Sequence, residues 1–193
     1  MISAAFLLAV QAATASAPYP ADAVLSAFRE ACSSLGDIQE ARAAADAAGW
    51  QSVEVRPGHP LFEIREIDRQ LGSRTQHADF IRTVSDRSLY LHLSHRQEGE
   101  IREHHCRVHD FDAQAPVERA AAEQWAGESA WWSHGLSRAG NHNTRFGSLF
   151  EGHGNTDVSF TTRAWAEANG IPAMRGVTMQ TWWTNAPPAP VVY

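Results

Sequence analysis

Two cysteines constrain what this chain can fold into, because both fall on apolar faces of predicted elements. Cys32 shares one stripe of a predicted helix with Val24, Phe28 and Leu35, and Cys106 lies on the apolar face of a predicted β-hairpin. A disulfide between them closes a long loop and pins a helix onto a sheet, with an expected gain of about 4 kcal/mol in the chain-entropy model. The alternative is two separate buried thiols; no C-x-x-C spacing indicates a redox role.

The first residues read as a secretory signal peptide. An apolar run over residues 4–10 precedes Ala15-Ser16-Ala17, which fits a small-residue cleavage site and gives 1–17 as the signal peptide. The run has no preceding Lys or Arg, so a short N-terminal core helix is the alternative. A leader followed by a cysteine pair indicates a periplasmic or secreted location. No other apolar run approaches the roughly 18 residues of a membrane span.

The remainder has the length and composition of one domain. We expect this domain over 18–184, followed by an extended Pro-rich tail over 185–193. The net charge of −6 disfavours nucleic acid as a partner. All 16 basic residues are arginine, which excludes Schiff-base catalysis and the lysine of a P-loop.

Hydrophobic periodicity predicts an α+β fold in which an N-terminal helical hairpin packs on an antiparallel sheet. The first helix should cover about 21–34, and the second should begin at a capping Asp37 and end at Gly49. The stretch 61–67 fits either a strand or a helical turn. Further helices are expected after Pro116 and near Thr162, and further strands are expected over 80–84, 88–109 (a hairpin) and 176–184.

The hairpin over 88–109 has a clear alternation. With its turn at Glu98-Gly99, the apolar face holds Leu89, Leu91, Leu93, Cys106 and Val108. The opposite face, expected to meet solvent, holds Tyr90, His92, Ser94, Glu103, His105 and Arg107.

Histidines on this hairpin suggest a metal site. In the predicted register His92 lies directly opposite His105, with Glu103 diagonal to both. Two imidazoles and a carboxylate are ligand types that Zn²⁺ or Cu²⁺ accepts. The alternative, which we favour, is a polar sheet face that merely contains histidines, so no cofactor is assigned and Zn²⁺ stays the alternative.

A second candidate site lies in the glycine-rich segment 128–160, which shows little periodicity. Long irregular segments in compact domains are often functional. Its polar side chains could form a pocket from His134, His142, Glu151, His153 and Asp157. No G-x-S-x-G nucleophile elbow or phosphate loop occurs in it.

The pattern from Phe28 to Cys32, the pair Gly49-Trp50 and the later Cys106 resemble features of a class of small secreted bacterial proteins. Members of that uncharacterised class have a signal peptide, an Ala-rich helical hairpin and one Cys pair. The resemblance covers about half of the mature chain. It implies no activity, so it assigns no functional residue.

The preferred function is therefore a non-catalytic binding or accessory protein of the cell envelope, with an envelope protein or a small ligand as partner. The alternative is an envelope hydrolase that uses histidines, with or without zinc. A third hypothesis is a surface whose many histidines charge between about pH 7 and 5 and so control association.

Overall fold

The computed structural model describes residues 19–34, 36–71, 75–127, 136–138, 140–147, 150 and 154–186. The expected signal peptide and residues 187–193 of the expected tail lie outside the described residues. Within the described part, no helix is both long enough and apolar enough to cross a membrane.

Five α-helices and one antiparallel sheet make up the described fold. The helices are α1 (Ala21–Cys32), α2 (Ile38–Ala47), α3 (Phe62–Leu71), α4 (Arg119–Ala126) and α5 (Arg163–Ala168), followed by the 3-10 turn η2 (Pro172–Met174). The strands are β1 (Gln51–Ser52), β2 (Thr75–Val84), β3 (Arg87–Glu98), β4 (Ile101–Asp110), β5 (Leu136–Arg138), β6 (Asn141–Phe146), β7 (Thr156–Thr161) and β8 (Gly176–Thr184).

The eight strands form a single sheet in the order β1-β2-β3-β4-β8-β7-β6-β5. All described strand pairs are antiparallel. Within the described residues, two runs of consecutive strands, β1–β4 and β5–β7, therefore meet through β8, the last of the described strands.

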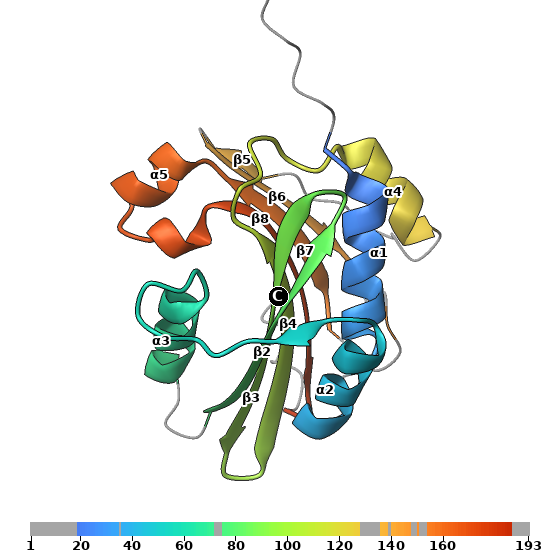
Figure 1. The fold of residues 1–193 in the computed structure, drawn as a ribbon, viewed down its shortest axis with the longest axis vertical. Helices are drawn as coiled ribbons and strands as arrows, with labels where there is room; N and C mark the ends of the chain where they lie inside the picture. The colour runs from blue at the N-terminus through green and yellow to red at the C-terminus, as the bar shows by residue number, and fades with distance from the viewer. Residues whose placement is uncertain are drawn as a thin grey trace, which may run out of the picture.

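The helices cover the two faces of the sheet unequally, as Figure 1 shows. Helices α1, α2 and α4 lie on one face, which we call the helix-rich face, and α3 and α5 lie on the other. The main core fills the helix-rich face and includes Phe28 of α1, Leu91 of β3 and Met179 of β8, all fully buried. The predicted α+β fold is confirmed.

The cysteine pair is also confirmed, because Cys32 and Cys106 form a disulfide with their Cα atoms 5.7 Å apart. It joins the last residue of α1 to the middle of β4. The expected start of the second helix is correct as well: the Asp37 carboxylate accepts hydrogen bonds from the backbone amides of Gln39 and Glu40 at 2.7 and 2.9 Å.

The predicted faces of the β3–β4 hairpin are correct, but its register was wrong by two residues. Glu98 pairs with Ile101, so the turn lies at Gly99-Glu100, and Leu93 rather than Leu91 faces Cys106. A shift of two residues keeps every side chain on its face, because side chains alternate with a period of two. The apolar pattern therefore determines the face of the sheet on which each side chain lies, but not the residue with which it pairs.

The face expected to meet solvent is instead partly covered. Residues 62–67 of the ambiguous stretch 61–67 belong to α3, which lies over this face (Figure 1). His92 and Ser94 on this face are buried, and His92 hydrogen-bonds to Asp68 of α3. A small second core of Leu61, Ile64, Phe111 and Ala173 attaches α3 and η2 to the sheet.

A glycine begins the central strand. Gly176 has φ of +85°, and a Cβ atom at this position would collide with the backbone carbonyl oxygen of Asp110. Both the left-handed backbone and the close approach to β4 require glycine here.

Candidate functional site

The sheet face under α3 carries a straight row of polar side chains across six neighbouring strands. Each member is paired in register with the next, so the alternation of side chains places all of them on one face. From β2 to β6 this polar row consists of Asp79, His92, Arg107, Gln180, Asp157 and Arg145.

Helix α3 adds two charged side chains to the polar row. Asp68 lies between His92 and Arg107: its Oδ2 accepts from His92 Nε2 at 3.0 Å and from Arg107 Nη1 at 2.8 Å. Arg65 donates from Nε to Asp79 Oδ2 at 2.6 Å, and Asp79 Oδ1 accepts from His92 Nδ1 at 2.6 Å. The result is a chain of alternating charge, Arg65–Asp79–His92–Asp68–Arg107, which attaches α3 to the sheet.

The two carboxylates of this charge chain favour the imidazolium form of His92. Burial alone lowers its pKa, but the hydrogen bonds to Asp68 and Asp79 outweigh burial and the pKa is raised. Burial likewise acts to raise the pKa of Asp68, and His92 and Arg107 together reverse that effect and lower it. A carboxylate only accepts hydrogen bonds, so both ring nitrogens of His92 must donate. A charged imidazole without a lone pair cannot serve as a general base.

His77 stands beside this chain on β2. Its ring stacks on His92 with centroids 5.2 Å apart, and its Nδ1 is buried with no hydrogen-bond partner in the structure. Burial, together with the nearby charge of His92, lowers the pKa of His77 to about 4. One ligand atom from each of Asp68, His77 and His92 lies within 4.8 Å of the others, so these three residues could hold a metal ion.

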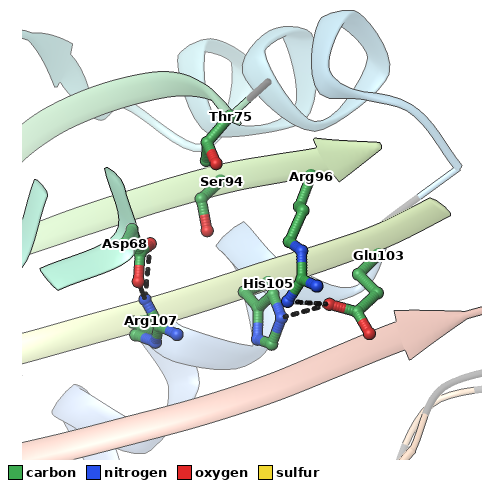
Figure 2. A pocket seen from close by; sticks show the side chains of 7 residues that line it. All are labelled: Asp68, Thr75, Ser94, Arg96, Glu103, His105 and Arg107. Atoms are coloured by element: carbon green, nitrogen blue, oxygen red, sulfur yellow. Dashed lines mark hydrogen bonds and ion pairs between the residues drawn. The ribbon is translucent and has the colours of Figure 1, made fainter. Parts of the chain in front are cut away.

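Two hollows flank the Asp68–Arg107 ion pair. The first is a pocket of about 130 Å³, shown in Figure 2, and its lining consists of Asp68, Thr75, Ser94, Arg96, Glu103, His105 and Arg107. The second, of about 120 Å³, lies on the other side of Asp68 and Arg107 and is partly apolar, with Ile64, Ile67 and Met174 in its wall. Since a water occupies roughly 30 Å³ of liquid, the first pocket has room for about four waters or for one small chemical group.

Charged side chains of both signs line the first pocket. Arg96 Nη1 lies 3.5 Å from Glu103 Oε2, and His105 Nε2 lies 4.0 Å from the same oxygen (Figure 2). Arg96 and Glu103 are about one-third exposed, at 31% and 30%, whereas Asp68 and Arg107 are 6% and 16% exposed. Burial, aided by Arg107, lowers the pKa of His105 to about 4, so its ring is neutral at pH 7.

The proposed grouping of His92, His105 and Glu103 is not formed as predicted. His92 pairs with Arg107 and His105 pairs with Ser94, because the register differs by two residues from the expected one. His92 is buried against Asp68 and Asp79, while His105 and Glu103 line the first pocket.

The second proposed grouping is divided by the sheet. His142 pairs with Phe160, and Asp157 is three residues away from Phe160 on β7, so His142 and Asp157 lie on opposite faces. His142 is exposed, and Asp157 is buried in the polar row beside Arg145 at 2.7 Å. His134, Glu151 and His153 lie outside the described residues.

Sequence reasoning missed Asp68, Arg65, Asp79 and His77. The three-residue spacing of Arg65 and Asp68 places both on one side of a helix. A helical assignment of 61–67 would therefore have indicated that these two charged side chains face the same way. Asp79 and His77 lie on the same face of β2 by alternation, but nothing in the sequence indicates which strand stands next to β2.

We compared the chain with protein-family models, with curated proteins and with solved structures, and none of the three comparisons yields a match.

Other buried histidines make the protein sensitive to acid. His104 stacks on His95 with centroids 4.2 Å apart, and burial together with His95 lowers the pKa of His104 to about 4. A pKa below the unfolded value of about 6.5 means that stability is present above pH 6.5 and is lost as pH falls toward 4.

We therefore expect the free energy of unfolding to fall by about 2 kcal/mol through His104 alone between pH 7 and pH 5. Urea denaturation at both pH values should show a smaller loss in His104→Gln than in the wild type. The exposed His142→Gln is the control and should lose as much as the wild type. Equal losses in His104→Gln and the wild type would contradict this account.

Proposed function

We propose that this protein is a non-catalytic binding protein of the cell envelope or the secreted fraction, and that it binds a small zwitterionic ligand in the first pocket. The observation that carries the proposal is the pairing of Arg96 with Glu103 at the mouth of a pocket with more deeply buried charges behind it. The disulfide favours an oxidising compartment, which agrees with the leader expected from the sequence.

The exposure of the two ion pairs indicates which one a ligand can replace. A solvent-exposed ion pair contributes only about 0–1 kcal/mol, so opening Arg96–Glu103 costs little. The carboxylate of a zwitterionic ligand can pair with Arg96, whose other partner, Glu98, lies 2.5 Å away, and the ammonium group can pair with Glu103. The more buried Asp68–Arg107 pair stays closed and forms one wall of the pocket.

The floor of the pocket supplies neutral hydrogen-bonding groups. Ser94 brings a hydroxyl and His105 an uncharged imidazole, both able to donate and accept. Most small-molecule sites have volumes of roughly 300–1,000 Å³. A pocket of about 130 Å³ therefore suits a ligand of amino-acid size or the charged end of a longer molecule.

Titration with single-charge and double-charge probes tests this proposal. We expect glycine and glycylglycine to shift the amide resonances of Ser94 and His105 in two-dimensional NMR spectra, and acetate and methylammonium to shift them at least tenfold less at equal concentration. Arg96→Gln and Glu103→Gln should each weaken glycine binding by about 10- to 150-fold, as loss of one charged hydrogen bond of roughly 1.5–3 kcal/mol implies.

The exposed pair Arg56 and Glu54 provides matched controls, because Arg56→Gln and Glu54→Gln remove the same charges from residues that do not line the pocket. Both control variants should bind glycine like the wild type. Equal binding of acetate and glycine would contradict the zwitterion proposal. Cleavage of glycylglycine during the titration would instead favour the hydrolase alternative.

A further inference from the structure

Three side chains with metal-ligating atoms converge under α3 from three different elements. Asp68 comes from α3, His77 from β2 and His92 from β3, and one ligand atom of each lies within 4.8 Å of the other two. Asp68 and His92 are buried and His77 is half-buried. The group is separate from the lining of the first pocket except for Asp68.

The spacing of two donors already approaches that of a shared tetrahedral ion. Zinc bonds of about 2.0–2.2 Å to nitrogen and oxygen place neighbouring ligands about 3.3 Å apart at a tetrahedral angle. His92 Nε2 and Asp68 Oδ2 are 3.0 Å apart, so an ion needs them to separate by only a few tenths of an ångström. The third donor, on His77, already lies within 4.8 Å of the other two.

The surroundings of His92 provide an independent observation. Histidines that ligate metal nearly always donate the other ring nitrogen to a carboxylate or carbonyl, which fixes the ring orientation. His92 Nδ1 donates to Asp79 at 2.6 Å, and Arg65 in turn donates to Asp79. The remaining nitrogen, Nε2, therefore faces Asp68 in a fixed orientation. His77 adds a buried Nδ1 that has no partner in the structure.

We propose that Asp68, His77 and His92 form a Zn²⁺ site in which the ion takes the place of the proton that His92 Nε2 donates to Asp68. Two imidazole nitrogens and one carboxylate oxygen suit zinc, whereas Ca²⁺ and Mg²⁺ prefer oxygen ligands alone. Three protein ligands leave the fourth position of a tetrahedral ion to an outside group.

The charge of the site restricts that fourth ligand. Exchange of one proton for Zn²⁺ raises by one the net charge of the five linked side chains that begin with Arg65 and end with Arg107. Excess buried charge is unfavourable. An anionic fourth ligand, such as hydroxide or a carboxylate, removes this excess. The site is thus of the open kind that binds or polarises an anionic group.

Measurement of zinc and cobalt binding tests the proposal. The full chain is produced without a histidine tag and stripped of metal with a chelator. We expect one equivalent of Zn²⁺ in competition with a chromophoric chelator, and the visible absorption of tetrahedral Co²⁺ after cobalt is added. His77→Gln should abolish the cobalt spectrum and weaken Zn²⁺ binding by more than the roughly 10- to 100-fold expected for loss of an outer partner. Asp79→Asn, which removes such a partner, should weaken binding about 10- to 100-fold and keep the 1:1 stoichiometry.

His142→Gln is the matched control, since His142 is exposed and lies on the other side of the sheet from Asp157 and the polar row. It should bind Zn²⁺ like the wild type. Wild-type affinity in His77→Gln, or zinc binding that only His142→Gln reduces, would overturn the proposal. His77 has no hydrogen bond to lose at Nδ1, so His77→Gln should fold, and near-ultraviolet circular dichroism verifies this.

The zinc site and the zwitterion pocket share Asp68 but can be tested separately. His77→Gln should leave glycine binding unchanged, because His77 is not among the residues that line the first pocket. Arg96→Gln should leave Zn²⁺ binding unchanged, because Arg96 is not a member of the ligand group.

Discussion

Reduction of the Cys32–Cys106 disulfide is expected to lower the free energy of unfolding by about 4–5 kcal/mol. The bond closes a loop with a sequence separation of 74 residues, and the chain-entropy model gives a gain of about 4.5 kcal/mol for a loop of that length. Urea denaturation of the oxidised protein, the reduced protein and the double variant Cys32→Ala/Cys106→Ala measures the difference.

Comparison of the reduced protein with the double alanine variant separates the contribution of the cross-link to stability from the contribution of packing. Both sulfurs are fully buried, so the alanine variant also loses buried volume and should be somewhat less stable than the reduced protein. If the reduced and oxidised proteins unfold at the same urea concentration, the disulfide adds nothing to stability and the α1–β4 attachment depends on packing alone.

Replacement of His92 with leucine is expected to lower the free energy of unfolding by about 3–5 kcal/mol, measured by urea denaturation at pH 7 with chelator present. The imidazolium donates to Asp68 and Asp79 at once, and without it each carboxylate keeps an arginine partner but loses a charged hydrogen bond of roughly 1.5–3 kcal/mol. Leucine has a similar size, so loss of volume contributes little.

A triple variant tests whether charge is the cause. Asp68→Asn and Asp79→Asn together with His92→Leu remove the two carboxylates that the single variant leaves without their imidazolium. Arg65 and Arg107 then lose their partners but are 25% and 16% exposed, which gives both access to water. The triple variant should therefore recover part of the stability lost in His92→Leu. A loss below about 1 kcal/mol in His92→Leu would show that the charge chain adds little to the attachment of α3.

Local signals in the sequence were enough for the helix-rich half of the fold. The helical period placed Phe28 and Cys32 on one stripe of α1, Asp37 supplied the cap of α2, and alternation separated Leu91 from His92. Each of these features depends on neighbours within a few residues along the chain. The disulfide could be predicted too, because two apolar faces each carrying a cysteine have to meet in one core.

The candidate site could not be predicted to the same degree because it depends on pairing between distant segments. An apolar pattern is unchanged by a slip of two residues, so His92 could be assigned to a face but not to its partner Arg107. Helix α3 was hidden because its stretch is short and rich in charge, with Ile67 still 37% exposed. The charged residues of α3 include Arg65, within the ambiguous stretch 61–67, and Asp68, directly after it, and their partners are in the polar row.

The position of β8 has a consequence for the order in which the molecule is assembled. During synthesis, β4 and β7 are both complete before Gly176–Thr184 has been made, yet each pairs with β8 along one side. Until β8 is available, the half-sheets that end at β4 and β7 each present an unpaired edge, the kind of surface on which chains aggregate. Strand β8 thus completes the described sheet by joining the edges of β4 and β7, and both edges have to stay free of other chains until β8 is made.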